Sequence, residues 1–112
     1  MNLSNLMSYS LGDKEFVRST TEIFIVESEK TLEQLKEAGQ KKDWERVNRF
    51  AHSLKSNYAT LEMEDLKNIA LSIEEDTKNH TGKAKDIMRK INMLNRKTHA
   101  VYPSLRHKLE LL

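Results

Sequence analysis

The chain has no cysteine, one proline and three glycines among its 112 residues. Without cysteine, disulfides, thiolate nucleophiles and thiolate zinc sites are excluded. Because strands and tight turns need more glycine and proline than this, the composition favours long helices. No apolar run approaches the roughly 20 residues of a membrane span, and the first ten residues lack the basic start and apolar stretch of a signal peptide. We therefore expect a cytoplasmic protein that makes no use of a membrane.

Charge is plentiful but unevenly spread. Charged residues make up 32% of the chain and hydrophobic residues 38%, and this length fits one domain, residues 1–112, with a modest core. The net charge is +2, yet residues 80–112 hold 8 basic and 2 acidic side chains. This last third could attract an acidic partner, although a solvated basic helix face is the simpler interpretation.

The spacing of apolar residues predicts one short leading helix and four long ones. Asp13 and Asp43 are expected N-caps, Gly39 is an expected helix end, and Pro103 is expected to kink or restart the last helix. The predicted helices span residues 2–9, 13–38, 43–61, 63–79 and 83–112.

The run IFIV, residues 23–26, is apolar on all sides of its helix, so we expect the leading helix to cover it. Short connections between amphipathic helices predict antiparallel neighbours. The predicted fold class is all-α, an antiparallel up-down-up-down four-helix bundle with a short N-terminal capping helix and a kinked C-terminal helix.

One histidine stands beside the apolar seam of the second long helix. The seam comprises Trp44, Val47, Ala51, Leu54, Tyr58 and Leu61. Because each residue turns the helix by about 100°, His52 projects to the side of that seam. Its neighbours three and four residues later are Lys55, which brings a positive charge, and Ser56, which adds little bulk.

That arrangement suits phosphoryl transfer through an imidazole. An exposed neutral imidazole is a nucleophile, and Lys55 would offset the negative charge of a phosphoryl group. Small side chains around His52 would let a second protein approach. No acidic cluster close to His52 resembles a Mg²⁺ site, so any metal ion for the transfer would come with the partner.

The stretch AHSLKSNYATLEMEDLKNIALSIEE, residues 51–75, resembles the signature of the histidine-containing phosphotransfer (HPt) domains of bacterial two-component phosphorelays. The resemblance extends from about residue 13 to residue 95. The matching positions are His52, Leu54, Lys55, Ala59, Leu61, Leu66 and Glu74. The chain departs from the family pattern where Ser56 and Glu62 replace glycines, so the turn at Glu62 must differ or carry strain.

The resemblance implies that His52 is the phosphoacceptor and Lys55 its charge partner. The implied partners are receiver domains of response regulators or of a hybrid sensor kinase, which also supply Mg²⁺. The chain itself is expected to be a monomeric carrier without cofactor, metal, small-molecule substrate or nucleic acid. The residues expected to contact the partner are Asn48, Arg49, Ser56 and Ala59.

An enzyme with its own nucleotide site is not supported. The sequence has no Gly-rich phosphate loop, and Ser53 follows His52 where a sensor kinase has glutamate. A second hypothesis is a non-catalytic helical adaptor of the same fold that binds a signalling partner through its surface, including the basic last helix. We assign no role to His80, His99 or His107, and we interpret the acidic run at residues 74–76 as a solvated helix end.

Overall fold

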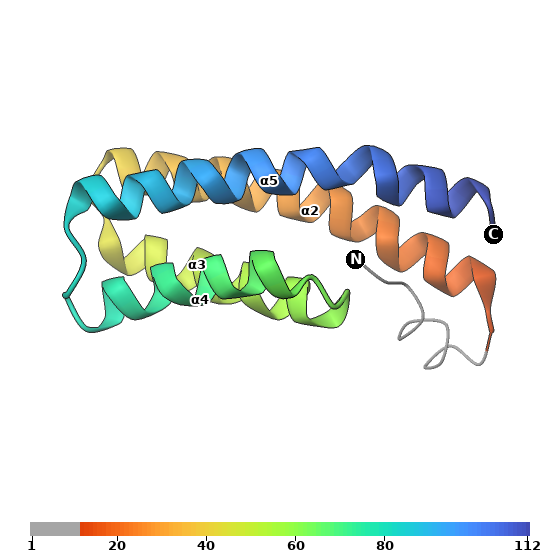
Figure 1. Ribbon diagram of the computed structural model, residues 1–112, viewed down its shortest axis with the longest axis horizontal. Helices are drawn as coiled ribbons and strands as arrows, with labels where there is room; N and C mark the ends of the chain where they lie inside the picture. Colours follow the sequence, from red (N-terminus) through yellow and green to blue (C-terminus); the bar gives the residue numbers. More distant parts are fainter. Residues whose placement is uncertain (1–11) are drawn as a thin grey trace.

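The computed structural model describes residues 12–112, which form four α-helices and no strand. These are α2 (Lys14–Gln40), α3 (Trp44–Thr60), α4 (Glu64–Lys78) and α5 (Ala84–Glu110). Figure 1 shows the long helices α2 and α5 side by side, with α3 and α4 beneath one part of their length. The predicted leading helix, residues 2–9, lies outside the described residues.

Two of the helix starts follow directly from the sequence. The Asp13 carboxylate accepts a hydrogen bond from the Phe16 amide at 3.1 Å, and the Asp43 carboxylate accepts one from the Arg46 amide at 3.3 Å. Each bond satisfies one of the free amides in a helix's first turn. The two predicted N-caps are therefore confirmed.

The predicted helix end at Gly39 is wrong. Helix α2 continues to Gln40, and Gly39 is buried inside it. A Cβ atom at this position would lie 2.6 Å from Met88 Sδ and 2.9 Å from Ile91 Cδ1. Gly39 therefore allows α2 and α5 to pack closely. The lack of a side chain suits glycine to this role as well as to a helix end.

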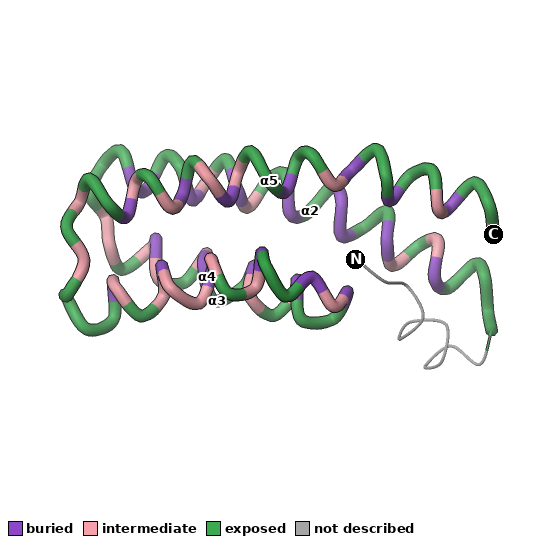
Figure 2. The backbone as a smooth tube through the Cα atoms, in the orientation of Figure 1, coloured by how far each residue is buried: buried purple, intermediate pink, exposed green. Residues whose placement is uncertain are grey.

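The core lies between the inner faces of all four helices (Figure 2). Val47, Ala51, Leu54 and Tyr58 of the predicted α3 seam are fully buried, and Trp44 packs partly buried against them. The other helices contribute the remaining large, fully buried side chains, which include Leu32, Leu35, Ile73, Ile91 and Leu94. Periodicity alone identified the inner face of α3.

The apolar run at residues 23–26 divides between core and solvent. Phe24 and Ile25 are buried, whereas Ile23 is 62% and Val26 63% exposed. The predicted cover over these side chains involves residues 2–9, outside the described part of the chain. Among residues 12–112, no helix combines the length and hydrophobicity that crossing a bilayer requires.

The helices form a ring in which α2 and α4 each pack against both α3 and α5. Helices α3 and α5 therefore lie diagonally, and a buried hydrogen bond of 2.7 Å joins Tyr58 Oη to Thr98 Oγ1 across the core. A second buried bond, 2.6 Å long, joins Ser28 Oγ of α2 to Tyr102 Oη of α5. Burial raises the pKa of both phenols, so they stay neutral as hydrogen-bonding groups.

Helix α5 continues through Pro103, so the alternative that this proline restarts the helix is wrong. Proline removes an amide hydrogen from the helix and crowds the carbonyl four residues earlier, at His99. Pro103 and His99 are both exposed, so water can reach the carbonyl that lacks its usual donor. The cost of the proline is thereby reduced.

Each interhelical connection contains a non-glycine residue with a left-handed backbone: Lys42 (φ 57°), Glu62 (φ 55°) and His80 (φ 53°). Side chains crowd the backbone in this conformation, which glycine adopts freely. Of the two expectations for Glu62, a different turn or a strained one, the left-handed backbone favours strain.

Replacing Glu62 with glycine should therefore stabilise the protein by about 1 kcal/mol, the left-handed penalty less the added freedom of the unfolded chain. Urea unfolding followed by circular dichroism measures the change. Thr60→Gly, two residues earlier in helical backbone, is the matched control and should destabilise by a few tenths of a kcal/mol, because glycine is a weaker helix former than threonine. A Glu62→Gly variant no more stable than the wild type would contradict the strain argument.

Candidate functional site

His52 stands on the outer side of α3, beside the edge of α4. Its side chain is 61% exposed, although the adjacent seam residues Ala51 and Leu54 are fully buried. The helical rotation that carries those two residues inward carries His52 outward. The imidazole is therefore accessible to a second molecule.

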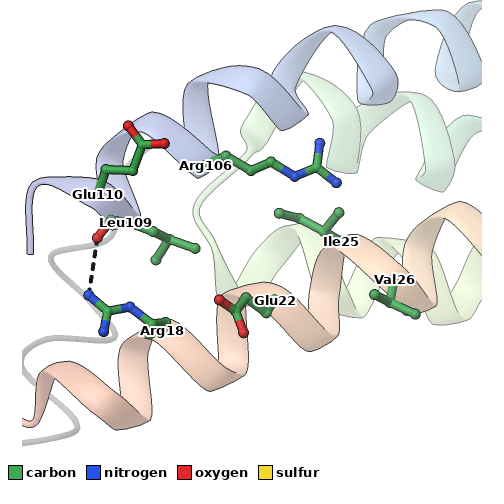
Figure 3. A pocket seen from close by; sticks show the side chains of 7 residues that line it. All are labelled: Arg18, Glu22, Ile25, Val26, Arg106, Leu109 and Glu110. Atoms are coloured by element: carbon green, nitrogen blue, oxygen red, sulfur yellow. Dashed lines mark hydrogen bonds between the residues drawn. The ribbon is translucent and has the colours of Figure 1, made fainter.

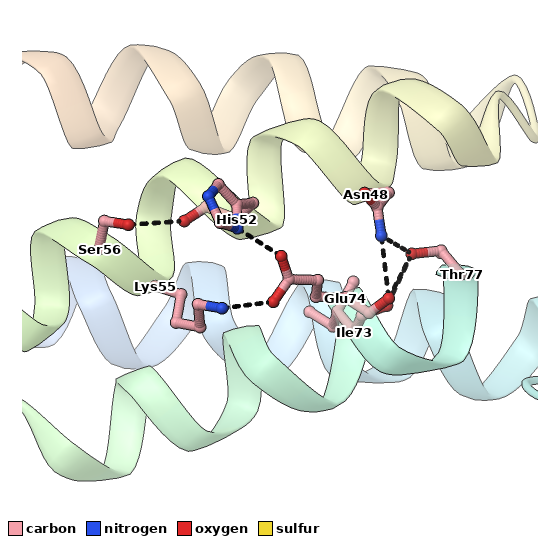
Figure 4. Close-up of polar contacts among 7 residues, drawn as sticks. All are labelled: Asn48, His52, Lys55, Ser56, Ile73, Glu74 and Thr77. Atoms are coloured by element: carbon pink, nitrogen blue, oxygen red, sulfur yellow. Dashed lines mark hydrogen bonds and ion pairs between the residues drawn. The ribbon is translucent and has the colours of Figure 1, made fainter. Parts of the chain in front are cut away.

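A carboxylate from α4 holds this imidazole. His52 Nδ1 lies 2.5 Å from Glu74 Oε2, and Lys55 Nζ donates to Glu74 Oε1 at 2.6 Å (Figure 4). The Glu74 side chain is only 15% exposed. Two residues from α3 and one from α4 thus form a single charged cluster.

The interpretation of residues 74–76 as a solvated helix end is wrong for two of the three. Glu74 belongs to the His52 cluster, and Asp76 Oδ2 accepts a 2.6 Å hydrogen bond from Lys90 of α5. The sequence offered one signal for Glu74, its match to the family pattern. Its contact with α3 depends on how two helices pack, which the spacing within α4 does not reveal.

The balance of effects on Glu74 keeps it ionised. Burial acts to raise its pKa, but the hydrogen bonds from Lys55 and His52 outweigh burial and hold the pKa below its ordinary value. An ionised carboxylate only accepts hydrogen bonds, so Nδ1 must carry the proton in the His52–Glu74 contact. In the neutral ring, Nε2 then keeps its lone pair, and this nitrogen points away from Glu74 (Figure 4).

Asn48 ties the two helices together one turn before His52. Its Nδ2 donates to the Glu74 backbone oxygen at 2.9 Å and to Thr77 Oγ1 at 3.1 Å. These bonds hold the backbone that carries the Glu74 carboxylate. The half-buried Asn48 therefore supports the cluster from within the bundle.

The other sequence-predicted residues surround the imidazole on α3. Arg49, Ser56 and Ala59 are exposed, and Ser56 Oγ donates to the His52 backbone oxygen at 3.3 Å. The Ser56 hydroxyl thus bonds to the backbone of its own helix. Lys55 Nζ binds Glu74, a contact that the sequence did not predict.

The family model for the Hpt domain matches residues 20–101, which include α3, α4 and the whole cluster. The chain belongs to the Hpt domain family. Searches of curated proteins and of solved structures found no match. Membership implies histidine phosphotransfer in phosphorelays, interaction with receiver domains, and the role of a phosphoryl carrier rather than of an enzyme that turns over a substrate.

Two other features of the described part of this Hpt domain lack the chemistry of the His52 cluster. Among residues 12–112, no group of three or more histidine, aspartate or glutamate side chains could hold a metal ion. A hollow between α2 and α5 is lined by Arg18, Glu22, Ile25, Val26, Arg106, Leu109 and Glu110 (Figure 3). Arg18 there donates to the Leu109 backbone oxygen at 3.3 Å, and the hollow contains no nucleophile.

The lowered pKa of Glu74 predicts a pH-dependent contribution to the stability of this Hpt domain. Because the folded pKa lies below the ordinary carboxyl value, the contribution is complete above that value. It is lost as the pH falls through the folded pKa. Glu74→Gln should lower the free energy of unfolding by on the order of 1 kcal/mol at pH 6, and the difference from wild type should shrink toward pH 3.

Denaturant unfolding at several pH values measures this difference. Glu75→Gln, at the exposed neighbouring position, is the control and should leave the pH dependence nearly unchanged. If the difference in unfolding free energy between Glu74→Gln and wild type stayed constant between pH 6 and pH 3, the lowered pKa of Glu74 would be contradicted.

Proposed function

We propose that His52 accepts a phosphoryl group on Nε2 from the phosphorylated aspartate of one receiver domain and passes it to the aspartate of another. The observation that carries this proposal is the orientation of the imidazole. Glu74 engages Nδ1 at 2.5 Å, while the ring is exposed and Nε2 points away from the cluster (Figure 4). Membership of the Hpt family supplies the class of reaction.

The transfer step balances without a cofactor in this chain. The Nε2 lone pair attacks phosphorus, an N–P bond forms, and the bond from phosphorus to the aspartate oxygen breaks with its electron pair leaving on the carboxylate. The Nδ1 proton stays on the ring, which gains positive character as the bond forms. Glu74 stabilises that charge across its hydrogen bond, and the partner receiver supplies Mg²⁺ for the phosphoryl oxygens.

The neighbours of His52 compensate charge, leave room for the receiver and hold α4 in place. Lys55 carries the positive charge that offsets the phosphoryl group, and it is positioned through Glu74 at 2.6 Å. Ser56 and Ala59 leave room for the receiver surface, while Arg49 offers a second cation beside it. Asn48 contributes through its bonds to α4. Since α3 and α4 of one chain supply all these groups, a monomer suffices.

Mixing the protein with a receiver domain carrying labelled aspartyl phosphate should transfer the label to this chain as an acid-labile, base-stable phosphate. His52→Gln should abolish the labelling, because no nucleophilic nitrogen remains at that position. His80→Gln, His99→Gln and His107→Gln are matched controls and should keep it. Circular dichroism should show unchanged helicity, and persistent labelling of the His52→Gln variant would overturn the site assignment.

Removing the carboxylate should weaken the preference of His52 for the tautomer protonated on Nδ1. We expect Glu74→Ala to shift the ¹⁵N chemical shifts of the ring nitrogens toward a tautomer mixture and to slow phosphoryl transfer by roughly ten- to a hundredfold. Glu75→Ala is the control with an exposed carboxylate. Unchanged nitrogen shifts in Glu74→Ala, with transfer at the wild-type rate, would show that Glu74 does not position the ring.

A further inference from the structure

A row of three cations lies along the outer face of α5. Lys85, Arg89 and Arg96 are exposed, and their spacings of four and seven residues place them on one side of the helix. This side faces away from the buried Ile87, Ile91 and Leu94. At 1.5 Å per residue the row is about 16 Å long. We call these three residues the α5 basic face.

The three cations of the α5 basic face have no acidic partner, in contrast to four lysines elsewhere in the described chain. Lys41, Lys55, Lys67 and Lys90 all form ion pairs with carboxylates at 2.6–2.9 Å. Within residues 12–112, no carboxylate oxygen lies within 4.0 Å of a side-chain nitrogen of the α5 basic face. Three cations thus stand together without neutralisation from the described part of their own chain.

Methionines give the same surface an apolar component. Met88 and Met93 are half-buried, and together with Asn92 and the three cations they line a shallow hollow. Thioether side chains are flexible and polarisable, and they adapt to the apolar groups of a partner. The surface therefore combines separated positive charges with compliant apolar contacts over three helical turns.

The α5 basic face lies away from the candidate transfer site. Helices α3 and α5 are diagonal in the ring, since each packs against α2 and α4. His52 projects from the α3 edge next to α4, and α5 lies behind both helices in that view (Figure 4). A partner on the α5 basic face would leave the imidazole open to a receiver.

We propose that the α5 basic face binds an acidic amphipathic helix of a partner protein, at the same time as a receiver uses His52. Carboxylates one or two turns apart on such a helix pair with the three cations, and its apolar side chains rest on Met88 and Met93. A lipid surface fits less well, because the exposed large apolar side chains of residues 12–112 are Phe16, Ile23, Val26 and Leu111, and none of them lies on this face. Nucleic acid also fits less well, because its phosphate backbone would contact the three cations and not the apolar side chains of Met88 and Met93.

The test uses the full chain and a fluorescein-labelled synthetic helical peptide with glutamates and leucines on adjacent faces. Fluorescence anisotropy at low salt should show binding that weakens as salt is added. The triple variant Lys85→Gln, Arg89→Gln, Arg96→Gln should bind about tenfold more weakly, as three exposed ion pairs are lost. Met93→Gln, which changes no charge, should also weaken binding.

The matched control removes three exposed lysines from α2, as Lys14→Gln, Lys30→Gln, Lys36→Gln, and should bind the peptide within twofold of wild type. Equal weakening by both triple variants would mean that only net charge matters and would overturn the proposal. So would tighter, α5-dependent binding to a DNA duplex or to phosphatidylserine vesicles than to the peptide. Labelling of His52 by a receiver should be unaffected in every variant, which separates this proposal from the proposed function.

Discussion

The site depends on one half-buried carboxylate that joins two helices. Glu74 projects from α4 between an imidazole and an ammonium of α3, at 2.5 Å and 2.6 Å. A partly buried negative charge is unfavourable unless hydrogen-bonded cations or donors surround it. His52 and Lys55 meet that need together. The need of the Glu74 carboxylate for hydrogen-bond donors thus orients the imidazole through Nδ1. The other ring nitrogen, Nε2, points away from Glu74 (Figure 4).

The connection between α3 and α4 determines which residues face one another across these helices. His52 lies eight residues before the end of α3, and Glu74 lies ten residues after the start of α4. At 1.5 Å per residue the two side chains are about 12 and 15 Å from the turn, so they arrive at nearly the same height. The left-handed backbone of Glu62 is part of that turn. The chain therefore tolerates strain at a position that places the carboxylate opposite the histidine.

Most of the fold could be predicted because the spacing of apolar residues along each amphipathic helix indicates which side of that helix is buried. The seam from Val47 to Tyr58 and the caps at Asp13 and Asp43 rest on local spacing and local hydrogen bonds, and they were predicted correctly. Gly39 was misread because a missing side chain permits both a helix end and close packing, and only the position of Met88 distinguishes them. Pro103 was left open between a kink and a restart, and the restart was wrong.

Part of the candidate site could also be predicted from helical periodicity. The outward projection of His52 and the exposure of Arg49, Ser56 and Ala59 follow from the period of α3 alone. Glu74 was different, since its environment is created by a neighbouring helix, and the periodicity of α4 marks it only as a residue off the buried stripe. A polar residue that bridges two helices is visible from a sequence only when a family pattern singles it out.

The two surfaces lie on helices that are diagonal in the bundle. A phosphoryl group on a serine, threonine or tyrosine side chain carries a charge of about −1.5 to −2, and a phosphoryl group on histidine is likewise strongly negative. Charges that interact across water are screened within about 8 Å at physiological ionic strength. The two shorter dimensions of the Cα trace are 21 and 18 Å, and α3 and α5 are diagonal within them. The field of a phosphoryl group on His52 is therefore screened wherever its path to Lys85, Arg89 or Arg96 runs through water. Any coupling between the two faces would have to pass through the packing of the bundle, where Tyr58 of α3 meets Thr98 of α5.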